Sequence, residues 1–107
     1  MRVLYFKPGI TRPMIYHIEN SLVSMQKTVG GYIESVTLHD GLVLICDEEA
    51  RLKGLPPNRL VDGAVICGPF FICRRKRDRL VELSYDEASR LRDREFQRWI
   101  PAQYAAT

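Results

Sequence analysis

A run of basic residues is the clearest opportunity for chemistry in this sequence. Five basic residues and one aspartate fill the six positions 74–79: Arg74, Arg75, Lys76, Arg77, Asp78 and Arg79. Closely spaced guanidinium and ammonium groups hold phosphate by Coulomb attraction and charge-assisted hydrogen bonds. Because the run lies between two apolar segments, it also fits a solvated hairpin tip, where charge is ordinary. Residue type alone leaves both interpretations open.

The loop over 53–59 is the second candidate, because Gly54, Pro56 and Pro57 exclude a regular element there. Glycine lets a backbone approach a ligand closely, and an arginine fork binds phosphate through two parallel hydrogen bonds. An aromatic side chain such as Tyr32 or Phe70 would then stack on a base. The candidate ligand-binding residues are therefore Tyr32, Lys53, Asn58, Arg59, Phe70, Arg74, Arg75 and Arg77. Whether the loop and the basic run are neighbours in space cannot be read from the sequence.

The remaining reactive residues do not form a catalytic pattern. His17 and His39 lie in a helical and a turn context without a neighbouring nucleophile, and no nucleophile elbow, zinc-protease or phosphate-loop motif is present. Adjacent carboxylates at 47–49 point in different directions and lack the alternating spacing of a calcium loop. We therefore predict no enzyme, no cofactor and no metal, with an unrecognised nucleotide-acting enzyme as the alternative.

The three cysteines, Cys46, Cys67 and Cys73, each end an apolar run, and they form no Cys-x-x-Cys pair. This usage is typical of buried thiols in a reducing compartment. The apolar stretch after Met1 is too short for the core of a signal peptide, and no segment approaches the length of a membrane span. The sequence therefore predicts a cytoplasmic protein that contacts no membrane.

The longest element that the spacing predicts is a helix near the N-terminus, after a short strand over 3–6. Thr11 is its expected N-cap, Pro13 lies in its first turn, and Gly30–Gly31 ends it. Its apolar residues recur at steps of three and four and line one face: Ile15, Ile18, Leu22, Met25 and Val29.

Strands follow this helix. Segments 32–38 and 42–46 flank Asp40–Gly41, a strong hairpin signal, and the continuous apolar run of the second predicts a central strand. Segments 64–67 and 70–73 predict strands on either side of a kink at Gly68–Pro69, and 79–83 a last short strand. Ser84 and Glu87 form a capping box that starts a second helix, which is expected to run to about Trp99, with Phe96 and Trp99 completing the core or meeting a second subunit.

With 107 residues, 46% of them hydrophobic and 27% charged, the chain fits one globular core. The predicted fold class is α+β: a single, mostly antiparallel sheet of about five strands, with one long N-terminal helix packed on it and a second, C-terminal helix. We expect one domain over residues 1–100 and a tail over 101–107.

Four motifs taken together resemble a known family. They are VGGYIE over 29–34, DGLVLICDEE over 40–49, LKGLPPNR over 52–59 and GPFFI over 68–72. The pattern is similar to a domain-of-unknown-function family of small proteins carried by phages and mobile elements, notably in Gram-positive bacteria. The family pattern usually has asparagine where this chain has Asp47 and glycine where it has Ala50. The resemblance implies genes with which phages and mobile elements manage their hosts, and it transfers no catalytic residue.

The origin in phages and mobile elements that the resemblance implies, taken together with the basic residues, suggests two functions. In the first, a non-enzymatic counter-defence protein binds and sequesters a phosphate-bearing small molecule such as a nucleotide immune signal, and a homo-oligomer would deepen its pocket. In the second, the basic hairpin binds a host protein or nucleic acid. The modest net charge of +3 weighs against nucleic acid.

Overall fold

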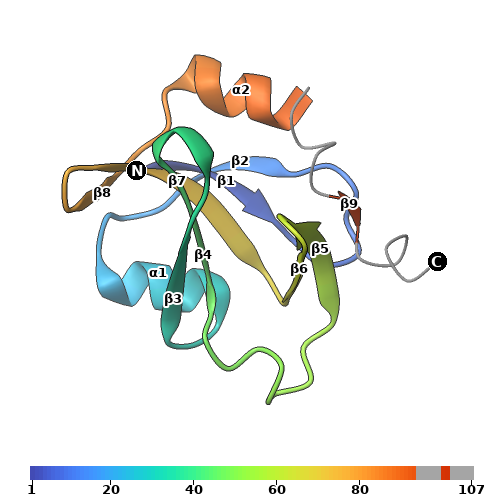
Figure 1. Ribbon diagram of the computed structural model, residues 1–107. Coiled ribbons are helices and arrows are strands. Elements are labelled where there is room, and N and C mark those ends of the chain that lie inside the picture. Colours follow the sequence, from blue (N-terminus) through green and yellow to red (C-terminus); the bar gives the residue numbers. More distant parts are fainter. Residues whose placement is uncertain (94–99, 102–107) are drawn as a thin grey trace.

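The structure is a computed structural model that describes residues 1–93 and the backbone of residues 100 and 101 (Figure 1). It contains two antiparallel sheets. The larger has the strand order β2-β1-β7-β4-β3, with β8 added to β7; the smaller has the order β6-β5-β9. The strands of the larger sheet are β1 Arg2–Phe6, β2 Met14–His17, β3 Ile33–Thr37, β4 Leu42–Asp47, β7 Phe70–Lys76 and β8 Arg79–Val81. Those of the smaller are β5 Pro57–Val61, β6 Ala64–Cys67 and β9 Ile100–Pro101.

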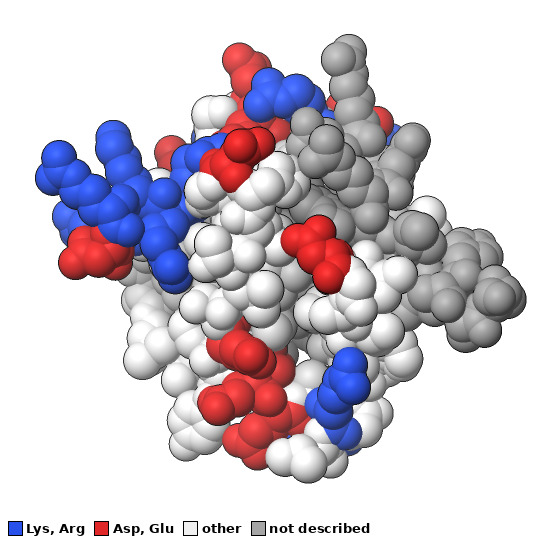
Figure 2. All heavy atoms as spheres, in the orientation of Figure 1, with Lys and Arg blue, Asp and Glu red and all other residues white. Residues whose placement is uncertain are grey.

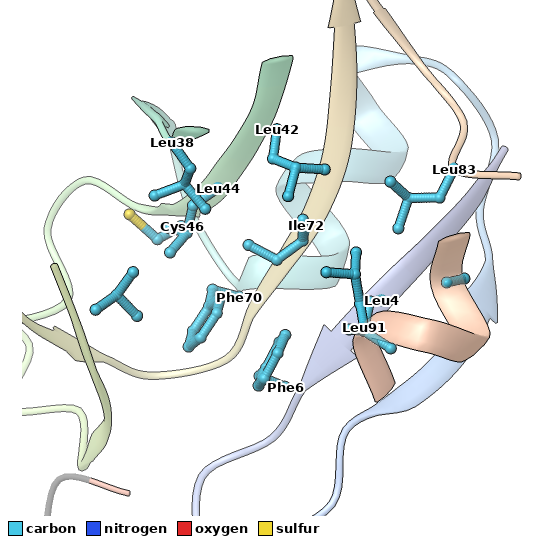
Figure 3. Packing of buried hydrophobic residues seen from close by; sticks show 12 residues of the cluster. Leu4, Phe6, Leu38, Leu42, Leu44, Cys46, Phe70, Ile72, Leu83 and Leu91 are labelled. Atoms are coloured by element: carbon cyan, nitrogen blue, oxygen red, sulfur yellow. The ribbon is translucent and has the colours of Figure 1, made fainter. Parts of the chain in front are cut away.

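Both faces of the larger sheet are covered. Successive residues of β4 and β7 point to opposite faces of the sheet and belong to two separate clusters. Val43 and Phe71 pack on the face covered by the helix α1 (Leu22–Val29), whereas Leu44 and Ile72 lie on the opposite face. On that other face lie the helix α2 (Tyr85–Asp93) and side chains of β5 and β6. Figure 3 shows the rings of Phe6 and Phe70 lying against each other to the left of α2, with ring centroids 4.6 Å apart.

The predicted long N-terminal helix is wrong, and with it the predicted fold class of a single sheet of about five strands. Met14–His17 is instead the edge strand β2, paired with β1, and α1 begins only at Leu22. Ser21 caps α1, since its hydroxyl accepts a hydrogen bond from the backbone N–H of Ser24 at 3.1 Å.

The periodic spacing failed because the isoleucines at its start also suit a strand. The segment is rich in β-branched and aromatic side chains, and Tyr16 stacks on Tyr5 of β1 with centroids 4.5 Å apart. Only Met25 and Val29 of the expected apolar face are buried in α1, whereas Leu22 is 57% exposed.

Other predicted elements are confirmed. Strands β3 and β4 form the expected hairpin around Asp40 and Gly41, both with positive φ, within a short 3₁₀ turn, η1 His39–Gly41. Strand β4 is buried along its whole length between β3 and β7. The backbone N–H of Glu87 donates to the hydroxyl of Ser84 at 3.0 Å, as the capping box predicts.

The second sheet was not predicted. Pro57, Asn58 and Arg59 were assigned to a loop, but they open β5, where Pro57 occupies the first position of the strand. Helix α2 is described as far as Asp93; the expected continuation to Trp99, including Phe96, lies outside the described residues. Pro101 lies in β9 opposite Arg59, and the rest of the expected tail, 102–107, is also outside them. No helix in the described part of the chain is long and apolar enough to cross a membrane.

Candidate functional site

The basic run forms a two-stranded ribbon that projects from the larger sheet. The first half of β7 is buried between β1 and β4, but its pairing with β4 ends at Arg74. Beyond that residue β7 pairs only with β8, through Arg75 with Leu80 and Lys76 with Arg79. Figure 1 shows this hairpin standing away from the body of the molecule on the left. We call residues 74–81 the basic ribbon.

Arg74 anchors the base of the ribbon. Its Nε donates to Glu87 of α2 at 3.1 Å, its Nη2 contacts the second oxygen of that carboxylate, and its Nη1 donates to the backbone oxygen of Asp40 at 2.6 Å. The hydrogen bonds that Arg74 donates to Glu87, together with the charges of Glu87 and Asp40, raise the pKa of Arg74 although burial opposes them. The guanidinium is therefore engaged within the protein.

The other four cations of the basic ribbon are exposed and unpaired. Arg75, Lys76, Arg77 and Arg79 make no ion pair or side-chain hydrogen bond within the described residues. In Figure 2 they contribute to the dense group of blue side chains at the left. Two of them, Lys76 and Arg79, face each other across the two strands.

A shallow hollow lies against the ribbon. It measures about 550 Å³ and is lined by Asn20, Lys76, Arg77, Arg79, Leu80 and Val81. The side chain of Asn20 donates to the backbone oxygen of Leu80 at 3.0 Å, which ties the ribbon to the segment before α1. Three cationic side chains and two apolar ones are thus gathered on one open surface.

Two of the predicted ligand residues in β5 are instead buried. Asn58 donates to the backbone oxygens of Phe6 and Gly68, at 3.0 and 2.8 Å. Arg59 is only 1% exposed, and its guanidinium donates to the backbone and side-chain oxygens of Asn58 and to the backbone oxygens at positions 10 and 11. Both side chains tie the chain segments to one another and present no donor to a ligand.

Phe70 is fully buried on Phe6 and offers no face to a base. Lys53 binds the buried carboxylate of Asp47, with Nζ 2.7 Å from Oδ2, and also donates to the backbone oxygen of Gly30 at 3.1 Å. Tyr32 is 66% exposed and lines a hollow of about 270 Å³ with Lys53. Of the predicted residues outside the ribbon, only these two reach a surface hollow.

The structure separates the two predicted groups of ligand residues. Leu42 at the start of β4 lies opposite Arg74, whereas Asp47, which binds Lys53, ends the strand five residues later. At about 3.3 Å per residue these ends of the sheet are roughly 17 Å apart. Lys53 and Tyr32 therefore do not share a pocket with Arg75 and Arg77.

Sequence reasoning left three polar residues of the ribbon's hollow out of the candidate set. Lys76 and Arg79 were noted in the basic run but not chosen, although a two-residue turn places them opposite each other. Asn20 lies within the segment that was predicted to be the N-terminal helix, and no pattern in the sequence connects it with position 80.

Cys46 and Cys73 are buried thiols and not reactive groups. Burial raises the pKa of Cys46 to about 11, with the charges of Glu34 and Asp47 adding to the effect. Burial also raises the pKa of Cys73 to about 12, against the opposing charge of Arg75. Cys67 is half-buried. No group of three or more potential metal ligands occurs among the described residues.

Fold and site together define a small protein of two antiparallel sheets whose exposed, unpaired cations project on a β-ribbon. The chain belongs to the family described as Domain of unknown function (DUF3846), whose family model matches residues 1–95. No curated protein and no solved structure gives a significant match.

Proposed function

We propose that this protein is a non-catalytic binder of phosphate-bearing ligands and that its main ligand is nucleic acid, held by the basic ribbon. One observation carries the proposal: Arg75, Lys76, Arg77 and Arg79 are exposed, and find no partner among the described residues, on a hairpin that extends past the sheet. Cations with internal partners stabilise a fold, whereas unpaired cations in a row favour an external polyanion.

Shape favours nucleic acid over a small anion. Charge lies on both faces and at the tip of the ribbon, so that one compact ligand could not reach all of it. A two-stranded ribbon fits the major groove of B-DNA, about 12 Å wide, and its flanks then face the phosphates on either side. With four phosphate contacts the modest net charge of the whole chain is no obstacle, because binding depends on the local cluster.

A phosphate-bearing small molecule is the second candidate, supported by the hollow beside the ribbon. Lys76, Arg77 and Arg79 would hold its phosphate there while Leu80 and Val81 contact its apolar part. This ligand would suit a counter-defence protein of a phage or mobile element that sequesters a nucleotide signal in the host cytoplasm. The hollow is open, however, and a second copy of the chain would have to close it.

The test is fluorescence anisotropy of a labelled 20-base-pair duplex over a range of salt concentrations. Four phosphate contacts predict a slope of log K against log salt of about −3.6, and each alanine substitution at 75, 76, 77 or 79 should make the slope shallower by about 0.9. Arg90→Ala, which removes an exposed cation on α2, is the matched control and should leave the slope unchanged.

A flat salt dependence, or equal effects of the ribbon variants and Arg90→Ala, would contradict the proposal. Competition by mononucleotides or cyclic nucleotides at micromolar concentration, with weak duplex binding, would select the small-molecule candidate instead. Conversion of any of these ligands would show an enzyme and contradict both.

A further inference from the structure

A groove lies between the open edges of the two sheets, apart from the basic ribbon. Its hollow measures about 140 Å³, and the residues that line it include Glu34, Glu48, Arg51, Leu52, Val65 and Ile66. The lining residues come from β3, the end of β4, the following loop and β6. In Figure 1, β3 and β6 stand on either side of this part of the molecule.

Strand β3 has an edge that no other described strand covers. It ends the strand order of the larger sheet, pairs among the described strands only with β4, and keeps a regular register from Ile33 to Thr37 without a bulge. Natural sheets guard such an edge with charged side chains, above all lysine, with proline or with a bulge. Strand β3 has no lysine, proline or bulge, and its one charged side chain is Glu34. Strand β6 likewise ends the order of the smaller sheet. Outward backbone donors and acceptors are therefore offered along the groove.

The charge of the groove is negative. Glu34 and Glu48 are exposed at its rim, and the carboxylate of Asp47 is already neutralised by Lys53. Arg51 is the one cation among the lining residues, and its Nη2 donates to the backbone oxygen of Val65 at 3.1 Å. Figure 2 shows acidic side chains gathered low on this face, well away from the blue group of the ribbon.

Apolar surface inside the groove remains uncovered by the described residues. Leu52 is 87% exposed at the rim, and Val65, Ile66 and Cys67 are only partly buried. A cavity of about 150 Å³ holds a benzene ring in protein interiors, so a hollow of this size accepts one aromatic or aliphatic side chain. An occupant therefore needs an apolar anchor with cations on either side.

We propose that this groove binds an extended peptide of a partner protein, which adds as a strand to the edge of β3. The peptide places one large apolar side chain in the hollow. Basic residues two positions before and after the anchor share its face of the strand, about 6.6 Å away along the chain, and pair with Glu34 and Glu48. Main-chain hydrogen bonds supply affinity, and the alternate side chains supply specificity.

The probe is a fluorescent pentapeptide, acetyl-Lys-Thr-Phe-Thr-Lys-amide, measured by anisotropy against the full chain. Glu34→Lys and Glu48→Lys should each weaken binding about five- to tenfold, since an attraction becomes a repulsion. Glu19→Lys reverses an exposed charge outside the groove and is the matched control. The peptide with glutamate in place of lysine should bind the double variant and not the original chain.

Backbone recognition is tested with two methylated peptides, one N-methylated at both threonines and one at the phenylalanine and the second lysine. At least one of them must bind more than tenfold more weakly, because alternate N–H groups of an added strand face β3. Peptide binding should also protect Cys67 from alkylation, which places the ligand in the groove.

If neither methylation weakens binding, or if Glu34→Lys and Glu19→Lys have the same effect, the proposal is overturned. Dimers that form with rising concentration and are disrupted by Glu34→Lys would assign the edge to a second copy of the chain and would also overturn it. These outcomes are independent of the nucleic-acid proposal, whose residues lie on the basic ribbon.

Discussion

At the scale of single residues, Arg59 and Arg75 carry the same guanidinium with opposite uses. Arg59 is buried without a carboxylate partner among the described residues, and four oxygens of the protein accept its hydrogen bonds. Burial lowers its pKa, and the guanidinium lies 5.4 Å from the ring centroid of Phe6. The planar guanidinium group, with its five N–H donors, can bind backbone oxygens and can also bind phosphate. The residue type therefore could not reveal which arginine is structural.

Asp47 should make the stability of the protein dependent on pH. Burial alone would raise the pKa of its carboxyl group, but hydrogen bonds from Lys53 and the backbone N–H of Glu49, with the charge of Lys53, outweigh burial and lower it. Because the pKa of Asp47 is lower in the folded than in the unfolded chain, its ionised carboxylate stabilises the folded protein at pH values above the unfolded pKa of about 3.9. This contribution should begin to fade below about pH 5 and disappear as the pH falls through the folded pKa.

Urea unfolding between pH 7 and pH 3 tests this expectation. Asp47→Asn should lose less stability on acidification than the original chain does. Lys53→Met should lower the free energy of unfolding at pH 7 by about 1–2 kcal/mol, a modest figure because the lysine side chain is 39% exposed. Identical pH profiles for the original chain and Asp47→Asn would show that the ion pair contributes nothing.

A side chain at position 31 would displace this ion pair. A Cβ atom at position 31 would lie 2.5 Å from Lys53 Nζ and 2.8 Å from Asp47 Oδ1. Gly30 has a different role, since its φ of 90° closes α1 in the left-handed conformation. The sequence predicted the helix end from this pair of glycines, but the close approach at Gly31 depends on a loop more than fifteen residues away.

At the scale of elements, local signals predicted those that depend on neighbouring residues. The β3–β4 hairpin, the capping box and the basic hairpin each rest on a turn or cap written within a few positions. The N-terminal helix failed because β2 is fixed by its pairing with β1, in which Leu4 lies opposite Ile15. The smaller sheet failed in part for a similar reason, since Arg59 of β5 pairs with the distant Pro101. Its β5–β6 hairpin does carry a local signal, the turn at Asp62 and Gly63, but the prolines at 56 and 57 favoured a loop over the strand before it. Such long-range partners leave no periodic trace in one sequence.

The turn of the basic ribbon is strained at Arg77, a residue of the proposed binding surface. Arg77 has a φ of 61°, a left-handed conformation that costs a side-chain-bearing residue about 1 kcal/mol relative to glycine. Arg77→Gly should therefore keep or raise the melting temperature while it weakens duplex binding and makes the salt slope shallower by about 0.9. Arg77→Ala removes the same charge without relieving the strain and should not raise the melting temperature. A variant that gains stability and keeps full duplex affinity would remove Arg77 from the binding surface.

At the scale of the whole molecule, the ribbon and the groove lie at opposite ends of the same sheet. Glu34 is paired with Cys46, four residues along β4 from Leu42, and Lys76 lies two residues beyond Arg74, the partner of Leu42. These steps amount to roughly 20 Å at about 3.3 Å per residue. Charges so far apart are screened at physiological salt, where the Debye length is about 8 Å.

A double-mutant cycle between Lys76→Ala and Glu34→Lys tests whether the two surfaces act independently. The change in duplex affinity caused by Lys76→Ala should be the same in both backgrounds within about 0.5 kcal/mol, and the same should hold for the pentapeptide and Glu34→Lys. A coupling energy above about 1 kcal/mol that grows with protein concentration would contradict independence. Its cause would be association between copies, with the basic ribbon of one copy bound in the acidic groove of another. Since such contacts are head-to-tail, they would build rings or filaments rather than a closed two-fold dimer, and sedimentation would separate these outcomes from two independent sites.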